Sequence, residues 1–178
     1  MPWMRPASDT PFGFRPYDAI KRIRPYAVSS GAAAIYQGDV VVLDSAGQIA
    51  VGTSASTQVL GVAAQYNAAS TANTSFLVYD DPNQLFYIQD DGDTTAMTAT
   101  HVGNNVNLVT TTGDTATLQS KHELDSSSAG TTAGQVCKVL ALHEMEGGSF
   151  ATGAGAPRKW VVQFNMHLYR DVVGQTGV

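Results

Sequence analysis

Residues 160–169 read Trp-Val-Val-Gln-Phe-Asn-Met-His-Leu-Tyr and carry the clearest periodic pattern in the chain. Large apolar side chains occupy every second position: Trp160, Val162, Phe164, Met166 and Leu168. Successive side chains of a β-strand point to opposite faces, so this alternation predicts a strand with one face in the core. The residues between them, among them Gln163, Asn165 and His167, are expected to face outward.

Short apolar runs separated by turn residues extend the same pattern toward the N-terminus. Residues 40–43 and 48–51 flank the turn-like segment Asp44-Ser-Ala-Gly47 and predict a hairpin. Residues 106–110 and 116–118 predict a second hairpin around Gly113. Further strands are predicted at residues 59–64, 75–79, 85–88 and 135–143. Since no segment has the pattern of a three-turn amphipathic helix, we expect an all-β fold, either a single barrel or a sandwich-like domain.

The strand pattern divides the chain into an arm and a body. Residues 29–178 are expected to form the all-β domain, with long loops near 90–105, 120–134 and 146–158. Loops of that length in a compact domain are usually functional, and here we expect them to make contacts with other chains. Residues 1–28 are expected to form an extended arm, because five of the seven prolines lie there and disfavour a continuous helix or an interior strand.

The arm also differs from the body in its aromatic residues and in its charge. It holds five of the fifteen aromatic residues, and residues 1–26 have a net charge of +3. Residues 27–120 contain eight aspartates and neither lysine nor arginine. The arm either folds back on its own domain or lies across a neighbouring subunit, and complementary charge favours association. The expected partner-binding residues are Trp3, Arg5, Phe12, Phe14, Arg15, Tyr17, Arg22, Arg24 and Tyr26.

Composition argues against several classes of protein. The single cysteine excludes an internal disulfide and any multi-cysteine metal site. No apolar run reaches the roughly 20 residues of a membrane-spanning helix, and no secretory signal is seen. The net charge of −5 is opposite to the basic footprint of nucleic-acid binding. We therefore expect a protein made in the cytoplasm that has neither a membrane nor a nucleic acid as its partner.

The residues that usually carry catalysis are scattered. Cys137 lies on an apolar strand without an adjacent histidine, which is typical of a core residue. The four histidines do not have the spacing of a metal site, and His122–Glu123 would point to opposite faces of a strand. Three carboxylates surround a glycine in 90–93, but the closing Glu of a calcium loop is missing, so we expect a solvated turn there. The sequence predicts no catalytic residue, metal or cofactor.

One segment resembles a known family. Gly38-Asp39-Val40-Val41-Val42, followed by Gly47 and Val59-Leu60-Gly61-Val62-Ala63-Ala64, is similar to phage head-decoration (capsid cement) proteins. The resemblance implies a β-tulip or small-barrel domain on the outer surface of the virion. There it would bind the major capsid protein and stabilise the shell by bridging neighbouring subunits, and we expect it to self-associate as a dimer or trimer. The alternatives are another virion component (a tail, baseplate or fibre subunit) or a carbohydrate-binding β module.

Overall fold

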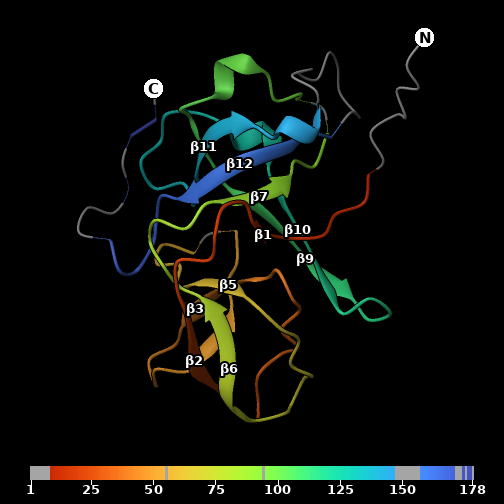
Figure 1. Ribbon diagram of the computed structural model, residues 1–178, viewed down its shortest axis with the longest axis vertical. Coiled ribbons are helices and arrows are strands. Elements are labelled where there is room, and N and C mark those ends of the chain that lie inside the picture. The colour runs from red at the N-terminus through yellow and green to blue at the C-terminus, as the bar shows by residue number, and fades with distance from the viewer. Residues whose placement is uncertain are drawn as a thin grey trace.

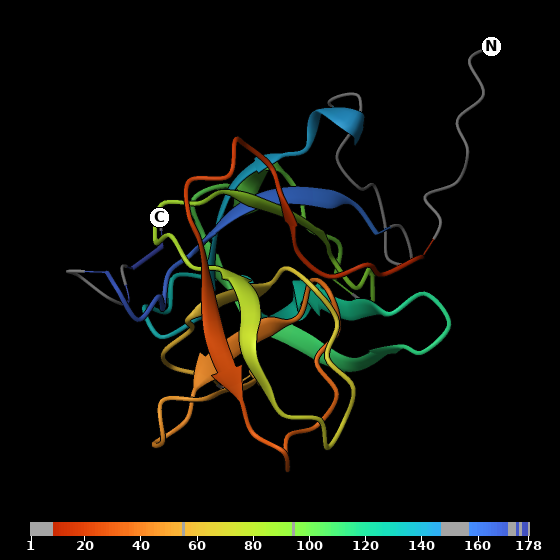
Figure 2. The same ribbon diagram turned by 60° about the horizontal axis from the view of Figure 1, so that its bottom comes forward.

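The computed structural model describes residues 9–54, 56–93, 95–146, 157–170, 174, 176 and 177 (Figures 1 and 2). Their regular structure is β-strand, apart from single-turn 3-10 helices at Ala99–His101, Ser126–Ser128 and Glu144–Glu146. The strands form two five-stranded antiparallel sheets and a separate hairpin. The predicted all-β class is confirmed, and the arrangement is sandwich-like.

The upper sheet in Figure 1 has the order β1-β7-β12-β11-β8. Its strands in that order are Arg15–Pro16, Phe86–Gln89, Lys159–Phe164, Cys137–Leu142 and Asn105–Val106. The lower sheet has the order β2-β6-β5-β3-β4, with strands Ile23–Val28, Asn73–Tyr79, Gly61–Ala63, Val40–Leu43 and Ile49–Val51. The hairpin of β9 (Leu108–Asp114) and β10 (Gln119–Leu124) projects to one side of both sheets (Figures 1 and 2).

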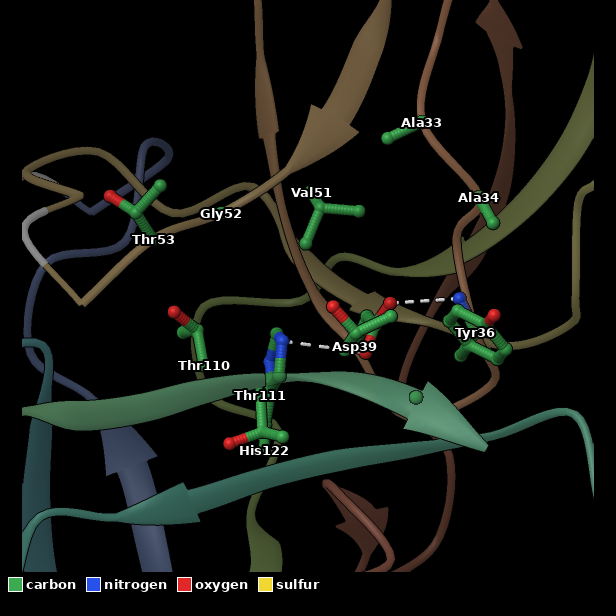
Figure 3. Close-up of a pocket in the computed structure, with 12 residues that line it drawn as sticks. Ala33, Ala34, Tyr36, Asp39, Val51, Gly52, Thr53, Thr110, Thr111 and His122 are labelled. Carbon is green, nitrogen blue, oxygen red and sulfur yellow. Dashed lines mark hydrogen bonds and ion pairs between the residues drawn. The ribbon is translucent and has the colours of Figure 1, made fainter. Parts of the chain in front are cut away.

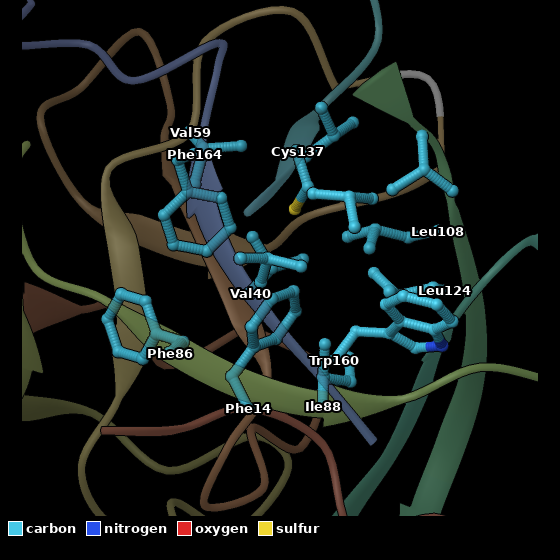
Figure 4. Close-up of a cluster of buried hydrophobic side chains, with 14 of the residues drawn as sticks. Phe14, Val40, Val59, Phe86, Ile88, Leu108, Leu124, Cys137, Trp160 and Phe164 are labelled. Carbon is cyan, nitrogen blue, oxygen red and sulfur yellow. The ribbon is translucent and has the colours of Figure 1, made fainter. Parts of the chain in front are cut away.

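The hydrophobic core has two parts that meet at the lower sheet. The larger cluster lies between the upper sheet, the hairpin and one face of the lower sheet, and it includes Phe14, Val40 and Trp160 (Figure 4). The smaller cluster lies on the other side of the lower sheet and includes Val41. Val40 and Val41 are both fully buried because their side chains point to opposite faces of β3. The valine-rich run at 40–42 therefore fits a strand with apolar surroundings on both sides.

The predicted hairpin at residues 40–51 is confirmed. Val41 pairs with Val51, and Leu43 pairs with Ile49. The Asp44 carboxylate accepts hydrogen bonds from the backbone N–H groups of Ala46 and Gln48, which fixes the turn. The turn residues of the sequence thus set the register of β3 and β4.

The strand predicted at 160–169 is confirmed for its first half only. Trp160, Val162 and Phe164 are buried as expected. The strand ends at Phe164, however, and the prediction that Val161, Asn165 and His167 face outward is wrong, since all three are buried. Asn165 can be buried because its side-chain amide donates to the carbonyls of Ala133 and Gln135, at 2.8 and 3.2 Å.

Two regions predicted to lack strands contain them. Residues 1–28 were expected to hold none, yet β1 and β2 lie there, and β2 pairs with β6 from Ile23 to Val28. Pro25 is tolerated because β2 is an edge strand of the lower sheet. The expected loop at 120–134 begins with β10, which replaces the predicted strand at 116–118 as the partner of β9. The described residues of the loop predicted at 90–105 contain no strand until Asn105, where β8 begins, whereas most of the loop predicted at 146–158 lies outside the described residues.

Candidate contact surface and buried polar sites

The N-terminal segment (residues 9–28) lies along its own body. Phe14 is 1% exposed and packs against Phe86 and Phe164, with ring centroids 6.0 and 5.1 Å away. The backbone N–H of Phe14 donates to the carbonyl of Gly38 at 2.9 Å. Phe14 is therefore part of the core, and the expectation that it contacts a partner is wrong in this structure.

Three of the other expected partner-binding residues fasten the segment internally. Arg22, Arg24 and Tyr26 all donate to the carboxylate of Asp80, which is fully buried. Burial raises the pKa of Asp80, but the hydrogen bonds from Tyr26, Arg22 and Arg24 together outweigh burial and hold the pKa below its usual value. The two guanidinium groups also lie over the ring of Tyr169, at 5.9 and 5.1 Å. This network joins β2 to the end of β6 and to the C-terminal part of the chain.

The exposed apolar side chains of the segment form what we call the N-terminal ridge, defined as Tyr17, Ile20 and Ile23. Their exposed fractions are 38%, 54% and 41%. In the described part of the chain, six large hydrophobic residues are exposed, and half of them belong to this ridge. The Tyr17 hydroxyl also donates to Glu144 at 3.1 Å, so the ridge passes close to the upper sheet. The ridge is the best candidate contact surface, because solvent-exposed apolar groups are concentrated there.

Phe12 and Arg15 line a groove next to the ridge. Phe12 is half-buried, with its ring 5.6 Å from that of Tyr87. Arg15, on the short strand β1, is also half-buried and lines the same groove. The remaining two predicted contact residues, Trp3 and Arg5, lie outside the described residues.

A second candidate site is a pocket of about 270 Å³ between the hairpin and the lower sheet (Figure 3). Asp39 and His122 point toward each other in it, with Nε2 of His122 3.4 Å from Oδ1 of Asp39. Each is only 2% exposed. The other carboxylate oxygen of Asp39 accepts from the backbone N–H of Tyr36 at 2.8 Å. Sequence reasoning did not single out this pair, although the buried positions of β10 alternate as Ser120, His122 and Leu124.

The geometry of the pair favours a structural role over proton transfer. The backbone N–H of Val40 donates to Nδ1 of His122 at 3.3 Å, so the ring proton of the neutral imidazole lies on Nε2 and faces Asp39. Burial lowers the pKa of His122, which favours the neutral ring. Because both ring nitrogens face protein groups, neither is free to accept a proton from a substrate. The pair holds the hairpin against β3.

The acidic segment at 90–93 is partly buried, so the predicted solvated turn is wrong for Asp90. Asp90 is 1% exposed and accepts from the backbone N–H of Arg158 at 2.8 Å and from Nε1 of Trp160 at 2.9 Å. Burial raises the pKa of Asp90 to about 6. Burial and the nearby Asp9 carboxylate raise the pKa of Glu123 to about 7. In the part of the chain that is described, no three His, Cys, Asp or Glu side chains are grouped as metal ligands would be.

Comparison with protein-family models, with curated proteins and with solved structures found no match. No helix among the described residues is both long and apolar enough to cross a membrane.

Proposed function

We propose that this chain is a structural virion protein that decorates a phage capsid and stabilises it by bridging neighbouring shell subunits. The observation that carries the proposal is the N-terminal ridge. Tyr17, Ile20 and Ile23 lie on a segment that is fastened to both sheets, so apolar groups are held at the surface by a rigid support. Rigid apolar and aromatic side chains of this kind dominate the energy of protein interfaces.

The body of the protein supports the same proposal. The segment that resembles cement proteins forms β3 and β5, which pair side by side in the lower sheet. Only 14% of the residues are charged, against roughly 25% in an average soluble domain, which suits a surface covered by other chains. In this account the protein is made in the host cytoplasm, acts on the outer surface of the virion and self-associates as a dimer or trimer. Its partner is the major capsid protein.

A matched pair of variants tests the role of the ridge. Ile20→Asp places a charge on the ridge, where the residue is 54% exposed, whereas Val102→Asp places one at an apolar residue that is 38% exposed and lies far along the chain. We expect Ile20→Asp to weaken binding to undecorated shells of the virus that encodes the chain at least tenfold, which corresponds to about 1.4 kcal/mol. Val102→Asp is expected to bind like the wild type.

Co-sedimentation with shells measures the binding, and analytical ultracentrifugation of the free protein measures its oligomeric state. Equal binding by the two variants and the wild type would show that the ridge is not the contact. Binding to tails or baseplates in place of shells would favour the other virion roles.

A further inference from the structure

Arg15 differs from the other described cations, because no partner for its side chain is found among the described residues. The other lysines and arginines in the described ranges each have a carboxylate or a carbonyl within reach. No ion pair, side-chain hydrogen bond or cation–π contact is found for the Arg15 guanidinium among those residues. The group is also half-buried, and this burial lowers its pKa. An unpaired charge that has lost part of its water is costly, so an anionic group that paired with Arg15 would be stabilised there.

The surroundings of Arg15 form a groove of about 480 Å³. The groove is lined by Phe12, Arg15, Gln37, Tyr87, Gln119 and Lys159. It therefore offers two cations, two carboxamides and two aromatic rings, and none of its lining residues is a carboxylate. Lys159 is partly neutralised, since Glu146 lies 3.4 Å from its ammonium group. Arg15 is thus the main charge available to a ligand.

The chemistry of the lining selects the class of ligand. A guanidinium matches a planar carboxylate, to which it donates two parallel hydrogen bonds. Carboxamides bind the backbone of a peptide, and aromatic walls pack against its apolar side chains. A polyanion such as nucleic acid fits less well, because the neighbouring cavity, which shares Phe12 and Gln119, contains two carboxylates (Asp9 and Asp114) and only one cation, Lys121. A single carboxylate can pair with the guanidinium inside the groove, whereas a chain of phosphates would extend into the neighbouring cavity and be repelled by its carboxylates.

We propose that the Arg15 groove binds the carboxylate of a Glu or Asp side chain on an extended segment of the shell protein. The shell as the source of that segment rests on the proposed function. The tilt of 51° between the rings of Phe12 and Tyr87 supports a peptide ligand, because the two rings do not form a flat platform for a sugar. The groove would add specificity to a contact whose apolar part comes from the N-terminal ridge.

Two blocked peptides test the groove directly: acetyl-Gly-Phe-Glu-Gly-amide and its counterpart with Gln in place of Glu. Titration is followed by NMR on the full chain, through the side-chain Nε–H signal of Arg15. We expect the Glu peptide to shift this signal saturably and to bind at least tenfold more tightly than the Gln peptide. Arg15→Gln should abolish the preference. Lys138→Gln, which removes a half-buried cation of the same sheet, should keep it.

Three results would overturn the inference: equal binding of the two peptides, a preference that survives in Arg15→Gln, or tighter binding of glucuronate than of the Glu peptide. The last result would assign the groove to an acidic sugar. Shell binding by the same preparations separates the two proposals. If the chain prefers the Glu peptide but does not bind shells, the ligand of the groove does not come from the shell protein, and the proposed function is contradicted. Shell binding without a Glu preference would remove the groove inference alone.

Discussion

Truncation of Phe14 to Ala tests whether the N-terminal segment belongs to the core. The side chain is 1% exposed and contacts the rings of Phe86 and Phe164. A fully buried Phe→Ala replacement costs about 3–5 kcal/mol, because apolar contacts are lost and a cavity remains. At about 2–4 °C per kcal/mol for a chain of this size, the melting temperature should fall by about 6–20 °C.

Urea denaturation followed by tryptophan fluorescence measures this loss, since Trp160 lies in the same cluster as Phe14. Phe12→Ala is the matched control, because Phe12 is two residues away, half-buried and outside the core clusters. We expect Phe12→Ala to cost less than half as much as Phe14→Ala. Equal and small losses in the two variants would refute the packing of residues 9–28 against their own body. That result would favour an arm that lies across a neighbouring subunit.

Two further predictions concern buried carboxylates. Between pH 4.5 and 7 the native state holds a proton on Glu123 that the unfolded state has released, so Glu123 destabilises the native state as the pH rises through 7. The free energy of unfolding of Glu123→Gln, relative to the wild type, should therefore rise by about 1–2 kcal/mol between pH 4 and pH 8, a value discounted for solvent screening. A difference in urea midpoints between the two proteins that does not change with pH would contradict this. Asp80→Asn should lower the free energy of unfolding by about 2–4 kcal/mol in the same assay, because Arg22 and Arg24 lose their charged acceptor. Asp9→Asn, at an exposed residue, is the control. An equal or smaller loss for Asp80→Asn than for Asp9→Asn would show that the network does not stabilise the fold.

The strands that could be predicted from the sequence are those with a local signature. The hairpin at 40–51 is encoded by its turn residues, and the alternation correctly predicts that Trp160, Val162 and Phe164 of β12 are buried. It misses Val161, which is buried on the opposite face of the same strand. Beyond Phe164 the same alternation misleads, because the burial of Asn165 depends on carbonyls near residues 133–135, which the local pattern does not contain.

The missed strands show which rules depend on tertiary context. Proline disfavours an interior strand but is tolerated in an edge strand, and β2 lies at the edge of its sheet. The sequence does not show which strand will lie at an edge. The polar residues of β10 hid its alternation, although Ser120, His122 and Leu124 are buried. His122 pairs with Asp39, a residue 83 positions away. A single sequence gives no signal for such a contact.

Residues of the candidate contact surface were predicted only in part. Tyr17 was expected to contact a partner and is exposed on the ridge, whereas Ile20 and Ile23 were not named and complete it. Arg15 was named for its charge alone. That its guanidinium has no partner among the described residues becomes visible only when the other described cations are placed, because each of them has a carboxylate or a carbonyl nearby.

The most direct test of the account is a low-resolution electron cryomicroscopy image of shells incubated with the purified chain. The account predicts extra density on the outer surface, in contact with at least two neighbouring shell subunits, together with greater resistance of the decorated shells to heat. Shells without added density at saturating protein, or density confined to a tail or baseplate, would contradict it.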